Sequence, residues 1–326
     1  MNPYPLLFEP SLHSKVWGGR AMETTLNKSL PQNEPVGESW EIYSGNYIAN
    51  GEFAGLTLGE LTARFPLEVA GVTAINGFPL LIKFLDAQDW LSVQVHPDDA
   101  LALTLEGEPR GKTECWYILD ATLNAEIIYG FSAETNERDF RDAIESGNAK
   151  NYLQFVSVKA GDFVNVPAGT VHAIGPGIML YELQQTSDTT YRLYDWERTG
   201  LDGKPRELHI DKGLQCSRFD VKAKAVSEQA TENITEGISV TSLVRGKFFG
   251  LDKMMISKQL WLNTESTTPH LLSIISGVVE ICGEFSSVRL ECGQSVLIPA
   301  KTGEYMLNPI ADATILCAFP QSNLDG

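Results

Sequence analysis

The 326-residue chain has little positive charge, few cysteines and no long apolar stretch. Its 25 Lys and Arg against 42 Asp and Glu leave a formal net charge of −17, which argues against a nucleic-acid partner and an anionic membrane partner. No apolar run reaches the length of a membrane-spanning helix, and no basic segment followed by an apolar one opens the chain, so we expect neither a span nor a signal peptide. The five cysteines are scattered, without Cys-x-x-Cys spacing, which predicts reduced thiols and a cytoplasmic location.

Three common catalytic fingerprints are also missing. The chain has no P-loop and no Gly-rich dinucleotide motif, so nucleotide binding has no support. It has no Gly-x-Ser-x-Gly, the motif that would indicate a serine hydrolase. The rest of the composition is that of a soluble globular protein, and the length predicts two domains or one large one.

What the chain does contain is a set of metal-ligand side chains at strand spacing. Gln94 and His96 stand two apart in an apolar run, and Lys112 and Glu114 repeat that spacing, so on strands each pair leaves one face. His96, Glu114 and His172 are ligand types that a borderline divalent cation prefers. Gln94 could add a neutral carbonyl oxygen as a fourth ligand. Iron and manganese suit these donors as well as zinc does.

Two segments resemble the paired motifs of the cupin barrels. The second motif is the run from Gly161 through Pro167 and Gly169 to His172. The first departs from the common pattern, because Gln94-Val-His96 stands where most cupins have His-x-His. That departure, with Lys-Thr-Glu at 112–114, is similar to the type I mannose-6-phosphate isomerases, the zinc phosphomannose isomerases. The segment 181–198 is also close to that family, and the resemblance covers about the first two thirds of the chain.

The resemblance implies an activity and a cofactor. It implies a zinc-dependent aldose–ketose isomerase, with one zinc per chain, that interconverts D-mannose 6-phosphate and D-fructose 6-phosphate through an enediolate. The partner is then a phosphorylated hexose. Two other functions stay open: a different metal-dependent cupin enzyme such as an iron oxygenase, and a sugar-binding cupin without catalysis. The oligomeric state, monomer or homodimer, is also open.

Three residues are the catalytic candidates. Lys112 shares the metal face with Glu114, and the resemblance places Glu182 and Arg192 near the substrate. Arg192 could stabilise the enediolate or hold sugar oxygens, while Glu182, Lys112 and His96 are rival candidates for proton transfer between C1 and C2. An acidic chain that binds a phosphorylated sugar must gather positive charge locally. The candidates for that charge are Lys15, Arg20, Lys112, Arg192 and Arg198.

The predicted fold class is mostly β, with cupin-type jelly-roll (double-stranded β-helix) barrels and helical decoration. The segment Gly293 to Pro299-Ala echoes Gly161 to Pro167-Ala, each with Gly, five residues, then Pro-Ala, which indicates an internal repeat. No His-x-His partner precedes the second copy, so we expect a degenerate C-terminal barrel without metal. We place a metal-binding catalytic domain at 1–225 and a smaller β domain at 226–326. The expected helices are 57–65, 132–146 with Ser132 as its cap, and 205–216.

Overall fold

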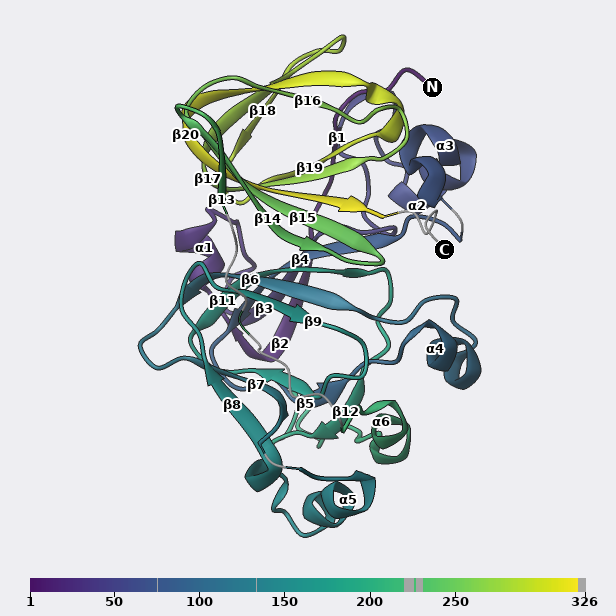
Figure 1. Cartoon of the computed structure of the whole chain (residues 1–326), viewed down its shortest axis with the longest axis vertical. Helices are drawn as coiled ribbons and strands as arrows, with labels where there is room; N and C mark the ends of the chain where they lie inside the picture. The colour runs from purple at the N-terminus through teal and green to yellow at the C-terminus, as the bar shows by residue number, and fades with distance from the viewer. Residues whose placement is uncertain (75, 133, 220–225, 227–230, 322–326) are drawn as a thin grey trace.

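The computed structural model describes residues 1–74, 76–132, 134–219, 226 and 231–321. In this part of the chain far more residues lie in strands than in helices, and the strands pair antiparallel. Two β units stack along the long axis of the molecule, the C-terminal one at the top of Figure 1. The predicted fold class, mostly β with helical decoration, is confirmed. No helix among the described residues is long and apolar enough to cross a membrane.

The lower unit is built from two sheets, and its core contains side chains of both. Sheet I has the order β2-β3-β4-β11-β6-β9, and sheet II has the order β12-β5-β10-β7-β8. The strands of sheet I are β2 (Ser11–Gly19), β3 (Val36–Ile42), β4 (Leu80–Ala87), β6 (Glu114–Ala121), β9 (Phe163–Val166) and β11 (Ile178–Gln185). Those of sheet II are β5 (Val93–Val95), β7 (Glu126–Phe131), β8 (Leu153–Ser157), β10 (His172–Ile174) and β12 (Tyr191–Tyr194).

The upper unit is one sheet, sheet III, with the path β1-β19-β17-β20-β15-β14-β13 and the side branches β16 and β18. Its first strand comes from the N-terminal end of the chain. The predicted division at 225/226 adjoins residues 220–225, which lie outside the described part, and it stays a prediction. The strands are β1 (Leu6–Leu7), β13 (Thr231–Thr235), β14 (Ile238–Arg245), β15 (Phe249–Ile256), β16 (Leu260–Asn263), β17 (His270–Cys282), β18 (Val288–Glu291), β19 (Ser295–Ile298) and β20 (Glu304–Pro320).

The helices are short and lie at the edges of the sheets. Capping explains where two of them begin. Thr57 accepts a hydrogen bond from the Glu60 N–H while the Glu60 side chain accepts from the Thr57 N–H, so the predicted helix is confirmed with a full capping box. The helix predicted from Ser132 begins only at Glu137, because Asn136 caps it. The α-helices are α1 (Ala21–Thr25), α2 (Leu58–Arg64), α3 (Pro66–Val69), α4 (Asp99–Glu106), α5 (Glu137–Glu145) and α6 (Ile210–Cys216).

The predicted internal repeat follows the same local path in both units. Gly161 has φ 90° and Gly293 has φ 86°, a left-handed backbone that favours glycine. Each is followed by a four-residue strand, β9 or β19, that ends at a Pro-Ala pair. β17 is a single strand whose register shifts around Gly277. One predicted helix begins later than expected: α6 begins at Ile210 rather than at residue 205.

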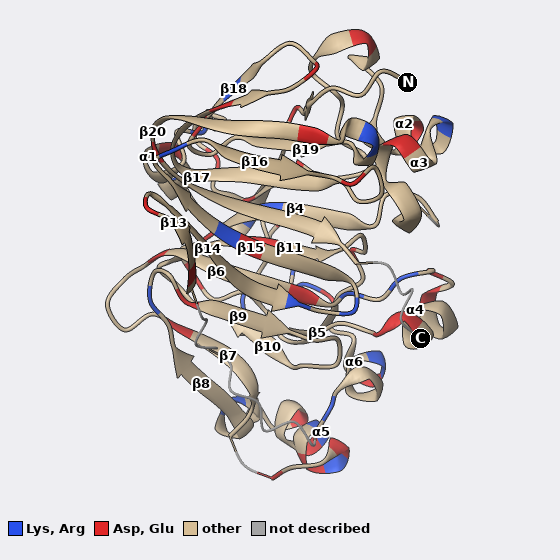
Figure 2. Cartoon of the chain, turned by 45° about the horizontal axis from the view of Figure 1, so that its top comes forward, with Lys and Arg blue, Asp and Glu red and all other residues tan. Residues whose placement is uncertain are grey.

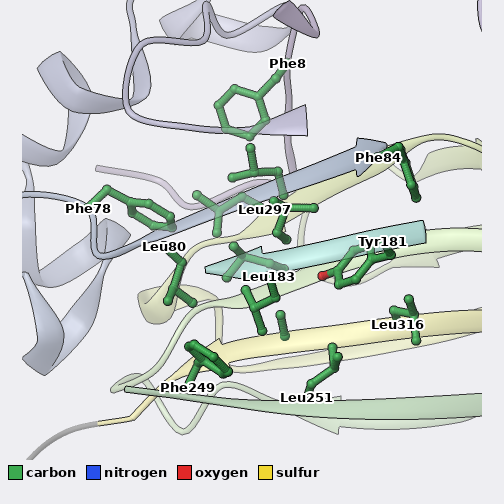
Figure 3. Packing of buried hydrophobic residues seen from close by; sticks show 14 of the residues in the cluster. Phe8, Phe78, Leu80, Phe84, Tyr181, Leu183, Phe249, Leu251, Leu297 and Leu316 are labelled. Carbon is green, nitrogen blue, oxygen red and sulfur yellow. The ribbon is translucent and has the colours of Figure 1, made fainter. Parts of the chain in front are cut away.

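Sheet I is buried on both faces, because the upper unit packs on its outer side. Leu80, Ile82 and Phe84 alternate along β4 and face a core that also contains Phe249 and Leu316 of sheet III. Figure 3 shows this core, with side chains from β4 and β11 packed against those from β15 and β20. The intervening positions of β4 face into the lower unit. Charged residues are dense on helices and loops, whereas the strand ribbons are mostly tan (Figure 2).

Candidate metal centre and active site

The strand registers place the metal-ligand candidates opposite one another inside the lower unit. In sheet II, Gln94 of β5 pairs with His172 of β10 on one side and with Arg192 of β12 on the other. Directly opposed residues in antiparallel strands share a face, so these three side chains form a row. Glu114 comes from the facing sheet I, at the first position of β6. The candidate site therefore joins the two sheets.

Three of the predicted ligands converge to contact distance. His172 Nε2 lies 3.3 Å from Glu114 Oε1, and His96 Nε2 lies 3.5 Å from Glu114 Oε2. One ligand atom from each residue lies within 4.8 Å of the others, and all three side chains are buried. The structure thus brings together His96, Glu114 and His172 as the sequence predicts.

Backbone carbonyl groups orient both imidazole rings. His96 Nδ1 is 2.9 Å from the Thr189 carbonyl oxygen, and His172 Nδ1 is 2.8 Å from that of Thr170. A carbonyl oxygen only accepts, so Nδ1 carries the proton in both rings and donates. The Nε2 lone pairs are left to point at Glu114, which is the arrangement that metal-binding histidines use.

The protonation states of the three residues suit a metal ion. Burial lowers the pKa of His172 and, helped by the nearby Lys112 ammonium, lowers that of His96 well below its ordinary value, so both rings are neutral. Burial alone would raise the pKa of Glu114, but Lys112 and the two histidines hold it below its usual range, so it is ionised. Glu114 Oε2 lies 2.9 Å from the Lys112 ammonium, and Oε1 lies 3.3 Å from His172 Nε2. Two neutral imidazoles and one carboxylate could hold a divalent cation.

Gln94 and Lys112 adjoin this cluster. The Gln94 amide nitrogen lies 3.3 Å from His172 Nε2, and its oxygen accepts from the Ser92 hydroxyl at 3.2 Å. Ligation through the amide oxygen would need a half-turn of the amide, so Gln94 as the fourth ligand stays a prediction. The Lys112 ammonium lies 2.9 Å from Glu114 Oε2 and 3.1 Å from His96 Nε2.

A cavity of about 250 Å3 opens beside the cluster. Among the described residues that line it, five are Lys or Arg and four are Asp or Glu, a local excess of one positive charge in a chain of net −17. Positive charge is thus gathered here, as the sequence analysis required. The charged lining residues are Lys15, Lys83, Lys112, Arg192, Arg206, Glu38, Glu114, Glu182 and Asp188.

A buried chain of alternating charges forms one wall. Lys83 of β4 lies 3.3 Å from Glu182 of β11 and 3.7 Å from Glu38 of β3, and Lys15 lies 3.1 Å from Glu38. Burial alone would raise the pKa of Glu38, but Lys83 and Lys15, with the hydrogen bond from Trp40, lower it to about 2. The pKa of Glu182 is raised by burial and by the charge of Glu114.

The sequence analysis missed Lys83, Glu38 and Arg206 as cavity residues. A signal existed for Lys83, since a single charge in the apolar run 78–84 has to find a partner or a function once buried. Of the predicted cations, Lys15, Lys112 and Arg192 line the cavity. The other two lie elsewhere: Arg20 pairs with Glu23 at the surface, and Arg198 pairs with Asp89 and Asp195.

Arg192 is half-buried at the cavity wall. Its Nη1 group donates to the Glu207 carbonyl oxygen at 2.8 Å. Its Nε group is buried and donates to none of the described residues. Burial and the neighbouring Arg206 lower its pKa, although a guanidinium stays charged.

Comparison with known proteins gives a consistent result for both units. The model of the type I phosphomannose isomerase catalytic domain matches residues 6–124, and that of the mannose-6-phosphate isomerase cupin domain matches 239–312. A mannose-6-phosphate isomerase of Streptococcus mutans is 40% identical over 300 residues, covering 90% of this chain and 92% of that protein. The crystal structure of mannose 6-phosphate isomerase from Bacillus subtilis is 35% identical with a TM-score of 0.88, covering 96% and 99%. A mutant phosphomannose isomerase from Salmonella typhimurium, 14% identical with a TM-score of 0.78, shares the fold.

Proposed function

Because the chain belongs to the type I phosphomannose isomerase family, we propose that it interconverts mannose 6-phosphate and fructose 6-phosphate. The observation that carries the proposal is the buried His-Glu-His cluster beside a cavity with excess positive charge. A cavity that combines a metal centre with arginine and lysine side chains suits a phosphorylated, hydroxyl-rich substrate. The cupin fold of both units and the family match thus agree with the chemistry of the site.

We infer that the metal is zinc, one ion per chain, held by His96, Glu114 and His172. Two imidazoles and one carboxylate form a donor set found in catalytic zinc sites, which keep another position open. The chemistry that zinc supplies in such a site is Lewis-acid polarisation of the sugar carbonyl. The carbonyl groups of Thr170 and Thr189 support this role, because they fix the rings with Nε2 directed inward.

Proton transfer is best assigned to Glu182 among the three rival candidates. Both nitrogens of His96 are engaged, one by the Thr189 carbonyl oxygen and one in the ligand cluster. Lys112 is paired with Glu114. Glu182 lines the cavity and its pKa is raised, and the Lys83 ammonium lies 3.3 Å from its Oε1. A carboxylate with a raised pKa can take the proton from one of C1 and C2 and return it to the other.

Lys112 and Arg192 then stabilise the negative charge of the enediolate. An anionic intermediate needs cations at its two oxygens, and both side chains line the cavity next to the ligand cluster. Lys83 has a different part, because it pairs with both Glu182 and Glu38. Its charge keeps two buried carboxylates close together in one wall.

We also propose a cytoplasmic location. All five cysteines are free thiols, and three of them are buried. An oxidising compartment would favour disulfide pairing, whereas reduced thiols are usual in the cytoplasm.

The test is a coupled assay for fructose 6-phosphate, with elemental analysis of the purified protein. We expect turnover, one equivalent of zinc per chain, and loss of both on chelation. His172→Ala should lose the metal and the turnover together. His13→Ala is the matched control, because His13 pairs with Ser11 and Trp40 outside the ligand cluster. A His172→Ala protein that keeps a full equivalent of zinc would overturn the ligand assignment.

A further inference from the structure

Two arginines share one carboxylate at the edge of the cavity. Arg206 donates twice to Asp195, from Nε to Oδ2 at 2.7 Å and from Nη2 to Oδ1 at 2.5 Å. Arg198 donates from Nη2 to the same Oδ1 at 3.1 Å and from Nη1 to Asp89 at 3.1 Å. Asp195 is only 6% exposed. A buried carboxylate thus holds two guanidinium groups, and the contact with Arg206 is the bidentate kind.

The backbone that presents Asp195 is strained. Trp196 and Glu197 both have left-handed φ values, 60° and 56°, in a turn closed by the Arg198 N–H to the Asp195 carbonyl at 3.3 Å. Such a turn normally takes Gly or Asn at these positions. Non-glycine residues keep a left-handed backbone conformation only where the surrounding structure holds them in it. Here the Trp196 indole donates to the Leu91 carbonyl oxygen at 2.7 Å.

The two arginines differ in what they can do. Arg198 does not line the cavity, and both of its terminal nitrogens already donate to carboxylates. Arg206 lines the cavity, and its Nη1 group makes no hydrogen bond within the part of the chain that the structure describes. One edge of the Arg206 fork is therefore held by Asp195, and the other edge is available to a ligand.

Arg206 lies at the far end of a row that starts at the metal ligands. His172, Gln94 and Arg192 are opposed across three neighbouring strands, which spans about 10 Å at the usual strand spacing. The segment that carries Arg206 is tied to the end of this row: Arg192 donates to the Glu207 carbonyl oxygen, next to Arg206. A hexose with its carbonyl carbon at the metal ligands and its chain extended along the row would place its phosphate toward Arg206.

We propose that Asp195 is a positioning residue for phosphate binding: it fixes Arg206 in the cavity wall, and Arg206 binds the phosphate group of the substrate. The inference rests on the proposed isomerase function and extends it to the non-reacting end of the sugar. A free arginine side chain loses several rotatable bonds of freedom when it binds. Asp195 removes that freedom in advance, so the guanidinium is pre-organised for the phosphate. Phosphate recognition by the planar fork is bidentate and depends on its orientation.

The experiment compares Asp195→Asn with Asp89→Asn in the full-length zinc enzyme. Asp89→Asn is the matched control, because it removes the other carboxylate of Arg198 and touches nothing on Arg206. For Asp195→Asn we expect KM for mannose 6-phosphate to rise about tenfold or more, with kcat within about threefold of wild type. The inhibition constant of inorganic phosphate should rise by a similar factor. Asp89→Asn should leave both constants close to wild type.

A double-mutant cycle with Arg206→Ala tests whether Asp195 acts through Arg206. Arg206→Ala should raise KM and the phosphate inhibition constant, and adding Asp195→Asn to it should change little further. Additive effects, or an unchanged or lower KM in Asp195→Asn, would overturn the proposal. If Asp195→Asn does not fold, a normal KM in Arg206→Ala overturns it alone. A wild-type protein without isomerase activity would contradict the proposed function instead, which is a different outcome.

Discussion

The histidines of the two β units have different surroundings: two form a candidate metal site in the lower unit, and one packs against aromatic rings in the upper unit. In the lower unit, His96 and His172 donate from Nδ1 to backbone carbonyls and keep Nε2 for the ligand cluster. In the upper unit, His270 contacts the Tyr305 hydroxyl at 2.7 Å, and its ring lies 6.3 Å from that of Phe319. Tyr305 follows Gly303, near the position that corresponds to His172 in the repeat. The start of β10 thus carries a candidate metal ligand, whereas the start of β20 carries Glu304 and the packed Tyr305.

Arg192→Ala should lower turnover by two or more orders of magnitude, about 3 kcal/mol of lost stabilisation of the anionic transition state. Zinc content and melting temperature should stay near wild type, because Arg192 is not a ligand and is half-buried. Arg192→Lys should restore only part of the rate, since Lys lacks the planar fork. Steady-state kinetics with elemental analysis checks this. Loss of zinc would show a structural role, and near-normal turnover would show that Arg192 does not contact the reacting atoms.

His270 should make the protein less stable in mild acid. Burial lowers its pKa to about 4, against an ordinary value near 6.5 in the unfolded chain. The stability that depends on neutral His270 is fully present above pH 6.5 and is lost as the pH falls toward 4, because the unfolded chain takes up the proton first. The expected loss is about 2 to 3 kcal/mol between pH 7.5 and 4.5. Urea unfolding at both pH values measures it.

His270→Asn supplies the comparison for that experiment. The amide can still bond the Tyr305 hydroxyl but does not titrate. All other groups titrate in both proteins, so the difference in pH sensitivity belongs to His270. An equal loss of stability in wild type and variant would refute the prediction.

Among the elements, the two strands of sheet II beside the histidine candidates, β5 and β10, are the shortest in the lower unit. β5 and β10 have three residues each, too few to be stable alone. β5 lies between β12 and β10, and β10 lies between β5 and β7. The ligand geometry is therefore set by neighbouring strands and by the loop carbonyls of residues 170 and 189, not by the ligand strands themselves.

Thr57→Ala should destabilise α2 and the protein by about 1 kcal/mol, because it removes half of the capping box. Activity should not change, since α2 does not line the cavity. Thermal unfolding measures the effect. Thr24→Ala is the control: its exposed hydroxyl only donates to the Ala21 carbonyl oxygen. A Thr57→Ala protein as stable as Thr24→Ala would show that the capping box adds nothing.

The whole molecule is held together by a core that both β units share. Sheet I faces this core with Phe84, Tyr181 and Leu183, and sheet III faces it with Phe249 and Leu316. Apolar burial at such a joint is large and non-directional, so the two units stabilise each other. Because the inner face of sheet I carries the cavity residues, loosening this core would also disturb the active site.

Phe249→Ala should cost about 3 to 5 kcal/mol, in line with large-to-small changes in a packed core. Phe249 is 2% exposed. We expect one cooperative calorimetric transition in wild type and variant, because each unit needs the other to cover its face. Phe155→Ala, at a position 39% exposed, should cost much less. Two separate transitions in the wild-type protein would show that the units fold independently.

The sequence by itself determined the local features of this protein. Period-two spacing set the face from which Glu114 and Lys112 project, and it placed Cys115 in the opposite core. The spacing of Gly, five residues and Pro-Ala revealed the repeat, and both glycines have a left-handed φ in the structure. Thr57 followed by Glu60 marked the start of a helix. These features depend on residues close together in the chain, so their physics can be read from the sequence. The prediction of His96, Glu114 and His172 as candidate metal ligands rests on local motifs of the same kind.

Tertiary structure alone decided how distant segments meet. The Lys83–Glu182–Glu38 wall joins three strands, and the Asp195–Arg206 pair joins two sides of a loop; neither has a local pattern. The start of α5 was decided by Asn136, which accepts from the Asp139 N–H while Ser132 donates to the Asn151 carbonyl oxygen, and the length of β20 by pairing with β15, β16 and β17. A buried lysine or glutamate needs a nearby opposite charge, because the low dielectric of the interior raises the free energy of an unpaired charge. Which charges meet is a property of the folded chain, and that decided the electrostatics of the cavity.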